Sequence, residues 1–300
     1  MRELSFVVPA AFDGCTLNDF LRRGKGVSYR MIKTAKQQTP PLGLFCNGAH
    51  IRTVDPVRQG DVVSLRWEEE ENQMSFSSVQ VPVLYEDASL VVFNKPWNMP
   101  CHPSRRHQAD TLGNVFAARC AQQGRMLPFR PVNRLDKDTT GIVVVAKDPY
   151  VAGCLAGKIE KEYLGILCGC PPQTSGTVDA PIRRVDPVRI LRQVSPDGQR
   201  AVTHYTVLAS GQGYSLARFR LETGRTHQIR VHMSYLGYPL AGDAWYGGSC
   251  DLIGHQALHC ASCTFSHPVT GAEIRLSAPL WESFKNTMGN AYIFYKNEQQ

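Results

Sequence analysis

Two carboxylates, Asp136 and Asp138, stand in the part of this chain that is best suited to chemistry. Residues 133–141 are charged and turn-forming, and they lead directly into the apolar stretch 142–146, which predicts a buried strand with a rigid loop before it. A carboxylate held on such a loop can act as an acid, a base or a nucleophile. The same side chains could instead cap a turn by accepting backbone hydrogen bonds, so the local pattern leaves both roles open.

A second segment, residues 221–232, is dense in hydrogen-bond donors. Thr223 and Gly224 predict a cap or turn at the start of a helical or extended element. The donors that follow are Arg225, His227, Arg230 and His232. The chain therefore contains one loop with two carboxylates, at residues 133–141, and one segment rich in cationic and histidine side chains, at residues 221–232.

The sequences NRLDKDTTG (133–141) and LETGRTHQIRVH (221–232) resemble two motifs of the RluA-type RNA pseudouridine synthases. In that family the first motif holds the catalytic aspartate and the second lines the same cleft. Further segments look like the family's elements in their usual order, and the likeness spans about residues 81–280: 86–104, 161–169, 179–184 and 255–271. The resemblance implies an α+β fold with a largely antiparallel, mixed sheet that is bisected by a catalytic cleft.

The resemblance also implies a reaction. Conversion of uridine to pseudouridine breaks the bond from ribose carbon 1 to the base nitrogen, turns the base and joins the sugar to base carbon 5. Nothing is oxidised, so neither a metal nor a nucleotide cofactor is expected. Asp136 would act as a nucleophile on the sugar or base, or as a base that forms a glycal, and the sequence does not choose among these. Arg225 would pair with Asp136, and Tyr163 would stack on the uracil and could take part in proton transfer, unless it is one more core tyrosine.

A uridine in folded RNA must leave its stack before it can react. Arg134 is placed to fill the vacated space, although a salt bridge to Glu86 or Asp87 is an alternative. Asn133 and Thr140 stand where the family commonly has histidine and serine. The other residues expected to contact RNA are Arg105, Arg106, His227 and Arg230, and, nearer the N-terminus, Arg22, Arg30 and Lys33.

Residues 1–70 predict a separate small α/β module, followed by a linker at 71–80 and a catalytic domain at 81–300. The expected helices of the module at residues 1–70 are 16–21 and 28–35, and its expected strands are 43–48 and 57–65. The arrangement resembles the RNA-binding module shared by a small-subunit ribosomal protein and tyrosyl-tRNA synthetases. Its basic helical face would contact RNA, or would simply be solvated. Such a module favours large-subunit ribosomal RNA over transfer RNA as the substrate.

Beyond the linker, the pattern predicts more strands than helices and no regular alternation of the two, which favours an α+β fold. Asp197 and Gly198 predict a hairpin turn between two of the strands. The expected helices are residues 111–120, 149–158 and 226–235. The expected strands are 91–93, 141–146, 162–168, 188–194, 201–209, 215–222 and 258–265.

Composition limits the class of protein. The formal charge of +7 is compatible with a polyanionic partner such as RNA, and a hydrophobic content of 43% indicates a globular chain. No signal-like opening and no apolar run of membrane-spanning length is present, so we expect a cytoplasmic protein with no membrane contact. The ten cysteines are irregularly scattered, which favours reduced thiols.

Two other classes stay open. A retaining glycoside or nucleoside hydrolase could use Asp136 as nucleophile and Glu222 as acid. A noncatalytic RNA-binding or ribosome-assembly protein would share the basic module and the fold. Cys260 and Cys263 have a zinc-like spacing beside histidines, but the resemblance implies a structural, metal-free strand there.

Overall fold

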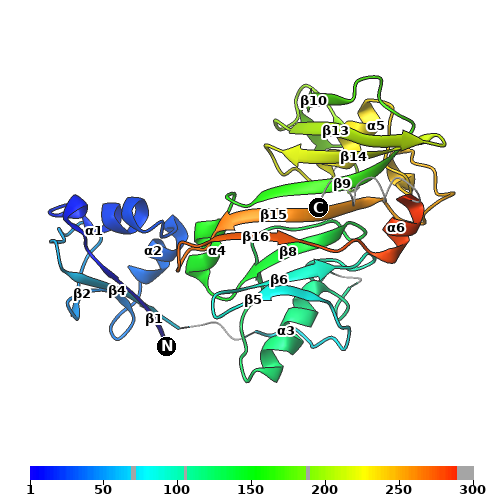
Figure 1. The fold of residues 1–300 in the computed structure, drawn as a ribbon. Helices are drawn as coiled ribbons and strands as arrows, with labels where there is room; N and C mark the ends of the chain where they lie inside the picture. Colours follow the sequence, from blue (N-terminus) through cyan, green and yellow to red (C-terminus); the bar gives the residue numbers. More distant parts are fainter. Residues whose placement is uncertain (69–71, 105–106, 187–189, 289–300) are drawn as a thin grey trace.

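The computed structural model describes residues 1–68, 72–104, 107–186 and 190–288 of the chain. Figure 1 shows a small N-terminal unit beside a larger body that is built around one long sheet. In these ranges, no helix combines the length and the apolar character that crossing a membrane requires.

The N-terminal unit is a four-stranded antiparallel sheet in the order β1-β4-β2-β3, with short helices packed on it. Helix α2 begins after Ser28, whose hydroxyl accepts a hydrogen bond from Met31 N at 3.2 Å, as the sequence predicted. The other expected helix begins after Thr16 and continues as a π-helical turn, η2. Strand β1 was not predicted. The elements are β1 (Arg2–Val7), η1 (Ala10–Phe12), α1 (Leu17–Asp19), η2 (Phe20–Gly24), α2 (Tyr29–Ala35), β2 (Gly43–Cys46), β3 (Ala49–His50) and β4 (Val62–Trp67).

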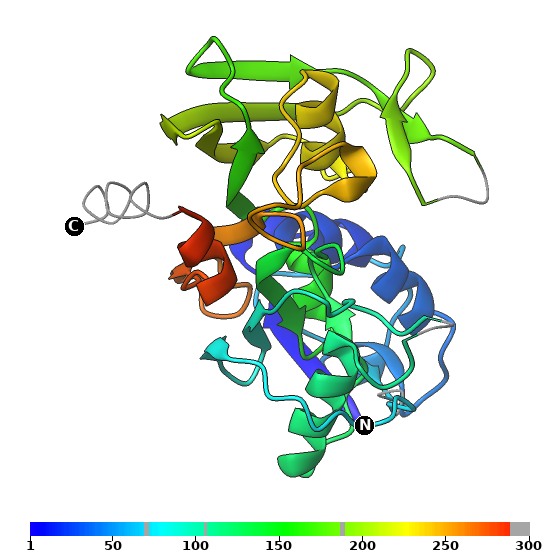
Figure 2. The ribbon, with the colours of Figure 1, turned by 90° about the vertical axis from the view of Figure 1, so that its right-hand side faces the viewer.

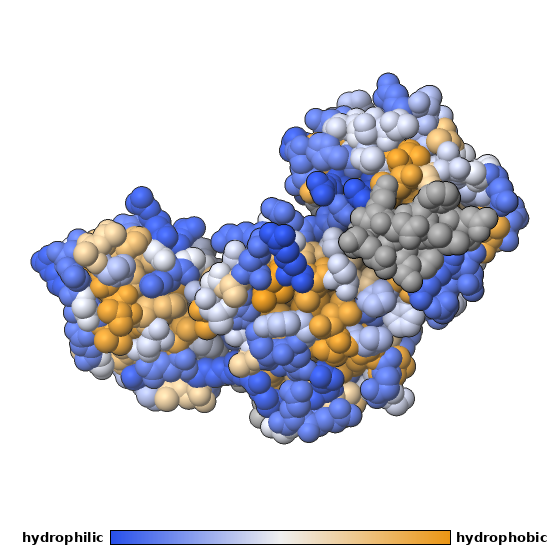
Figure 3. Space-filling view, viewed as in Figure 1, coloured by the Kyte–Doolittle hydropathy of each residue, from blue (hydrophilic) through white to orange (hydrophobic). Residues whose placement is uncertain are grey.

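The N-terminal unit contacts the larger body at helix α4 (Pro149–Leu155). The rings of Phe6 and Tyr150 lie 5.7 Å apart, and the Tyr150 hydroxyl donates to Lys25 O at 3.1 Å. Figure 3 shows the N-terminal unit and the larger body side by side and in contact. The chain between them is itself fastened: Asn114 Nδ2 donates to Ser75 O at 2.8 Å, so the segment expected as a linker lies against α3 (Leu112–Gln122).

The long sheet has ten strands in the order β10-β13-β14-β9-β15-β8-β6-β5, with β16 added to β15 and β7 added to β8. Every pairing is antiparallel except that of β15 with β8, so the prediction of a largely antiparallel, mixed sheet is confirmed. The strands are β5 (Val83–Glu86), β6 (Leu90–Lys95), β7 (Arg130–Pro131), β8 (Thr140–Ala146), β9 (Glu160–Cys168), β10 (Ser175–Asp179), β13 (Val202–Gly211), β14 (Tyr214–Leu221), β15 (Leu258–Ser266) and β16 (Glu273–Ser277).

The parallel pair β8 and β15 joins the two halves of the sheet through two residue pairs, Thr140 with His259 and Gly141 with Cys260. Gly141 has a φ of +105°, and a Cβ there would lie 2.2 Å from Cys260 O, so only glycine fits this close approach. On one side of the junction, α4 packs on β8; on the other, α5 (Gln228–Tyr235) packs on β13. Figure 2 shows the two halves one above the other.

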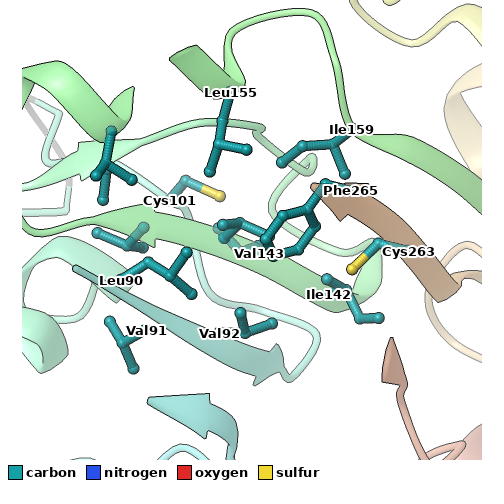
Figure 4. Close-up of a cluster of buried hydrophobic side chains, with 14 of the residues drawn as sticks. Leu90, Val91, Val92, Cys101, Ile142, Val143, Leu155, Ile159, Cys263 and Phe265 are labelled. Atoms are coloured by element: carbon teal, nitrogen blue, oxygen red, sulfur yellow. The ribbon is translucent and has the colours of Figure 1, made fainter. Parts of the chain in front are cut away.

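Strands β6 and β8 lie at the centre of the largest hydrophobic core cluster. All residues of β6 and β8 are buried, which agrees with the continuous apolar pattern of strands covered on both faces. Figure 4 shows Val143 beside Phe265 and Ile142 beside Cys263 of β15, in one hydrophobic cluster that also includes Val92 of β6. The loop that precedes β8 is therefore anchored to a strand that is buried along its whole length.

One predicted pairing is wrong. The turn at Asp197 and Gly198 forms, because Gly198 N donates to Ser195 O at 2.9 Å, but it does not join a hairpin. Strand β12 (Arg192–Val194) pairs with β11 (Ile182–Arg184) in a separate two-stranded sheet, whereas β13 pairs with β10 and β14. Local turn chemistry predicts the bend, but the choice of partner depends on long-range contacts.

Candidate active site

Asp136 lies in the loop between β7 and β8, at the junction of the two halves. Thr139 N donates to Asp136 O at 3.2 Å, and the Asp136 side chain is 25% exposed. Asp138 accepts a hydrogen bond from Asn98 N at 3.2 Å instead. Asp138 therefore takes the structural role in the turn, which leaves the carboxylate of Asp136 to face the cleft.

The buried side chain of Lys95 contacts the backbone of the loop that carries Asp136. Lys95 Nζ donates to Pro96 O at 2.8 Å, Met99 O at 2.9 Å and Lys137 O at 3.0 Å. Burial lowers the pKa of Lys95 to about 8, against the opposing effect of nearby acidic groups, which are Cys101, Asp138 and Asp136. Because Lys137 directly follows Asp136, this contact restrains the backbone beside the carboxylate.

The cation that contacts Asp136 is Arg230, from the first turn of α5. Arg230 Nη1 donates to Asp136 Oδ2 at 3.1 Å, while its Nε and Nη2 donate to the two oxygens of Asp243 at 2.7 and 2.9 Å. The side chains of Arg230 and Asp243 are 6% and 2% exposed. A bidentate bond of this kind fixes the plane of the guanidinium, so Asp243 orients the donor that reaches Asp136.

The expected pairing of Arg225 with Asp136 is wrong. Arg225 Nε donates to Arg200 O at 3.0 Å, and the Arg225 backbone N–H donates to Gln228 Oε1 at 2.9 Å. The cause is local: His227 has a φ of +58°, a left-handed conformation that turns the chain just before α5. Residues on either side of that turn point in different directions, and Arg230 faces the carboxylate.

His227 is the second polar group beside Asp136, with its Nε2 at 3.8 Å from Asp136 Oδ2. Its Nδ1 lies 2.7 Å from the Tyr246 hydroxyl, which also accepts a hydrogen bond from Arg192 N at 3.0 Å. Within the described residues, the hydroxyl proton of Tyr246 has only Nδ1 as acceptor, which assigns the ring proton to Nε2. Burial lowers the pKa of His227, so a neutral ring presents an N–H group toward Asp136.

Tyr163 closes the site from the sheet. It lies in β9, in register with Phe219 of β14 and Cys260 of β15, and is 6% exposed. Burial raises the pKa of Tyr163 well above 10, so the phenol stays protonated. A neutral ring at the wall of a pocket is suited to contact a flat base, and it is not suited to act as a strong base itself.

These side chains surround one open hollow. A pocket of about 660 Å³ continues into a smaller one of about 90 Å³, and Asp136, Tyr163 and Arg225 line both. The smaller pocket also exposes His227 and Arg230. Arg134, a largely exposed residue, lines both pockets as well. The larger volume falls in the range of small-molecule sites and can hold a nucleotide.

The remaining predicted residues are distributed as follows. The alternative for Arg134, a salt bridge to Glu86 or Asp87, is not formed among the described residues. Glu86 instead pairs with Arg119 and Lys147, and Asp87 pairs with His267. Arg105 and Arg106 lie outside the described residues. On the N-terminal unit, the side chains of Arg22, Arg30 and Lys33 are exposed, and none of the three lines either pocket.

The two departures from the family pattern have structural roles. Asn133 Nδ2 donates to Ile142 O at 3.0 Å and Asn133 Oδ1 accepts from Val144 N at 2.9 Å, which staples the loop to β8. The Thr140 hydroxyl lies 2.7 Å from His259 Nδ1. Both side chains thus satisfy buried hydrogen-bonding groups behind the cleft.

The geometry also bears on the hydrolase and zinc alternatives. Hydrogen bonds from Arg200 and His204 lower the pKa of the exposed Glu222, whereas a general acid needs a raised one. The thiols of Cys260 and Cys263 are buried in β15, and burial raises the pKa of both to about 12. Within the described ranges, no group of three His, Cys, Asp or Glu residues is arranged to hold a metal ion.

A carboxylate bound by an oriented arginine lies in a pocket large enough for a nucleotide, at the junction between two parts of the sheet. Residues 89–235 match the family model described as RNA pseudouridylate synthase. The chain belongs to the RluA-type family of RNA pseudouridine synthases, which are isomerases.

Individual relatives agree with this assignment. The uncharacterized RNA pseudouridine synthase YjbO of Bacillus subtilis is 38% identical over 85% of this chain and 92% of its own length. Ribosomal large subunit pseudouridine synthase D of Pseudomonas aeruginosa is 36% identical over 80% of this chain and 81% of its own. The structure titled human RNA pseudouridylate synthase domain containing 4 is 26% identical, with a TM-score of 0.57 over 70% of this chain and 92% of that one. The predicted fold and enzyme class are thereby confirmed.

Three important side chains were not singled out from the sequence. Asp243 and Tyr246 stand in the segment 237–247, where glycines bracket an acid and aromatic residues. Lys95 ends the buried strand LVVFNK, in which four apolar residues precede Asn94. A lysine at the end of a buried strand and an aspartate in a glycine-rich loop are weak but real signals, because burial of either requires a partner.

Proposed function

We propose that this protein converts a specific uridine of folded large-subunit ribosomal RNA to pseudouridine by a cofactor-independent reaction that depends on Asp136. The observation that carries the proposal is the position of Asp136: it faces the pocket and accepts a hydrogen bond at 3.1 Å from Arg230, which Asp243 orients in turn. A carboxylate held in this way is preorganised for catalysis.

The reaction is balanced without any added group. The bond from ribose carbon 1 to base nitrogen 1 breaks, the uracil turns, the bond from carbon 1 to carbon 5 forms, and the proton on carbon 5 is replaced by one on nitrogen 1. Asp136 acts as nucleophile on the sugar or base, or as the base that removes a sugar proton. Tyr163 holds the uracil by stacking, because its protonated ring lines the pocket.

The base must reach Asp136 from a folded RNA. Extrusion costs on the order of a few kcal/mol, which new contacts must offset. Arg134 lies exposed at the pocket, two residues before Asp136, and enters the space that the uridine leaves. Arg22, Arg30 and Lys33 of the N-terminal unit bind RNA phosphates at a distance from the reaction.

Ribosomal RNA is supported by analogy. The Pseudomonas aeruginosa relative is named for the large ribosomal subunit, and it aligns with four-fifths of this chain. Pseudouridine mapping in a strain that lacks the gene identifies the RNA: a missing pseudouridine in large-subunit RNA supports the proposal, and one missing only from transfer RNA contradicts it.

The decisive variant is Asp136→Asn, which keeps the shape of the side chain and removes its charge. We expect turnover to be abolished, as measured by tritium release from carbon 5 of uridine, while RNA affinity stays close to that of the wild type. Asp138→Asn is the matched control, because Asp138 serves the turn through Asn98 N. Measurable turnover by Asp136→Asn would refute the proposal.

Base extrusion has its own test. Arg134→Ala should lower turnover on structured RNA far more than on an unstructured oligonucleotide, in which little unstacking is needed. Equal losses on both substrates would rule out the flipping role of Arg134.

A further inference from the structure

Strands β11 and β12 form an arm that stands outside the long sheet. Figure 2 shows this arm at the upper right, projecting from the half of the body that carries α5. The described part of the arm is residues 182–186 and 190–194. The reaction derived above assigns no role to it.

A hollow of about 440 Å³ lies between the arm and the start of the segment that leads into α5. Among the described residues that line it, four side chains are cationic and one, Asp197, is acidic. The cationic residues are Arg183, Arg184, Arg192 and Arg225. We refer to this hollow as the arginine pocket. Its excess of positive charge is suited to anions, because guanidinium groups match the geometry of phosphate oxygens.

The arginine pocket adjoins the catalytic pocket. Gly224, Arg225 and Thr226 line both the arginine pocket and the larger catalytic pocket, so the two share a wall. Arg225 makes one side-chain hydrogen bond to the described residues, from Nε to Arg200 O, which holds its guanidinium at this shared wall. Arg225, which does not pair with Asp136, therefore lies between the two pockets.

The arm is also tied to the catalytic side chains. The Arg192 backbone N–H donates to the Tyr246 hydroxyl at 3.0 Å, and that hydroxyl contacts His227 Nδ1 at 2.7 Å. At the other strand, Ile182 forms a bridge with Gln199. The arginines of the arm thus have a defined position relative to Asp136.

We propose that the arginine pocket binds backbone phosphates of the RNA next to the extruded uridine. The inference rests on the proposed function. An extruded nucleotide keeps a phosphate on each side, so its backbone must leave the catalytic pocket across one of the pocket's edges. The edge at Arg225 leads directly to the arginine pocket. Contacts of this kind position the RNA without reading its sequence.

The test uses the full chain with Arg183→Gln and Arg192→Gln combined, which removes two charges and keeps the backbone N–H of residue 192. Arg275→Gln is the matched control, because Arg275 is an exposed arginine of β16 paired with Glu273 at 2.8 Å. Arg183 is likewise exposed and paired, with Asp197 at 3.5 Å.

Two measurements are made on each protein. The Kd of a fluorescein-labelled single-stranded oligoribonucleotide of mixed sequence is measured between about 50 and 200 mM salt. KM and kcat are measured by tritium release from ribosomal RNA of a strain that lacks the gene. We expect Kd and KM to rise about tenfold in the double variant, with the loss falling on KM rather than kcat. The slope of log K against log salt should become shallower by about 1.4, or about 0.7 for each lost phosphate contact.

A Kd and salt slope equal to those of Arg275→Gln would overturn the inference while leaving the proposed function intact. Absence of turnover by the wild-type protein on every RNA would instead overturn the proposed function. If thermal unfolding shows that the double variant is destabilised, the variant Asp197→Asn provides the test instead, because it removes the negative charge from the arginine pocket. The Kd of the oligoribonucleotide should then fall, and an unchanged Kd would count against the inference.

A chemical change in the RNA identifies the phosphate directly. Methylphosphonate linkages on either side of the single uridine in the oligonucleotide remove the charge and keep the backbone. Binding to the wild type should weaken, and binding to the double variant should not weaken further, because the two changes remove the same contact. Equal weakening in both proteins would show that these phosphates are held elsewhere.

Discussion

Replacement of Asp243 by Asn tests whether Arg230 is the working partner of the catalytic carboxylate. Asp243 accepts two bonds from Arg230, at 2.7 and 2.9 Å, and both side chains are almost fully buried. The amide of Asn can accept only one of these bonds and directs an NH₂ group at the other donor. Breaking a buried ion pair by removing one charge costs about 3 kcal/mol or more.

This loss should be visible in both stability and activity. About 3 kcal/mol corresponds to a fall in Tm of roughly 6–12 °C in a domain of this size. The hydrogen bond from Arg230 Nη1 to Asp136 survives, but the guanidinium loses its fixed plane, so kcat should fall by about ten- to a hundredfold with little change in KM. Tritium release and thermal unfolding measure the two effects.

Asp251→Asn is the control for this experiment, because Asp251 is exposed in the same C-terminal part of the chain and bonds only to Ser249 among the described residues. It should behave like the wild type. A protein with Asp243→Asn that keeps both the Tm and the kcat of the wild type would refute the view that Arg230 is oriented by a buried partner.

Three further predictions concern the surroundings of the site. Tyr246→Phe removes the hydroxyl that donates to Nδ1 of the neutral His227 ring, so the lowered pKa of His227 should rise. The acidic limb of the pH–rate profile should then move to higher pH, and an unmoved limb would contradict the tautomer assignment. Burial alone would raise the pKa of Glu86, but hydrogen bonds from Arg119 and Lys147 lower it to about 2. The stability that this provides should be complete above pH 4.5 and be lost as the pH falls toward 2, by on the order of 1–2 kcal/mol, and Glu86→Gln should abolish this dependence in acid unfolding curves. A shortened protein that begins at Val79 should fold and keep turnover but bind RNA with a shallower salt dependence, and an unchanged slope would show that the N-terminal unit does not contact RNA.

The sequence predicted the elements whose signals are local. The apolar run of β8 and the charged loop before it located Asp136, and Ser28 capped α2 where its hydroxyl was expected. These features depend on a few consecutive residues, so the competing structures are few. The pairing of β11 with β12 depends on contacts over many residues, and the turn at Asp197 could not reveal it.

The choice between Arg225 and Arg230 was beyond the sequence for a more specific reason. The two residues are five positions apart, and either could face Asp136, depending on where α5 begins. The structure begins the helix at Gln228, after the left-handed His227, and this single dihedral angle turns Arg225 toward Arg200 O. Histidine adopts that conformation more often than most residues, but still in a small minority of cases, so the residue type alone gives little signal.

The buried charges of the site are hard to explain by stability alone. An ion pair as buried as Arg230 and Asp243 contributes little to folding in comparison with apolar residues of the same size. Lys95, fully buried beneath the loop, carries a similar cost, since its ammonium must be desolvated. Both groups converge on the few residues around Asp136, one through its carboxylate and the other through the backbone of Lys137. Their cost is understandable if the chain needs a carboxylate whose position does not change when RNA enters, because an oriented charge lowers a barrier only when it does not have to be reoriented during the reaction.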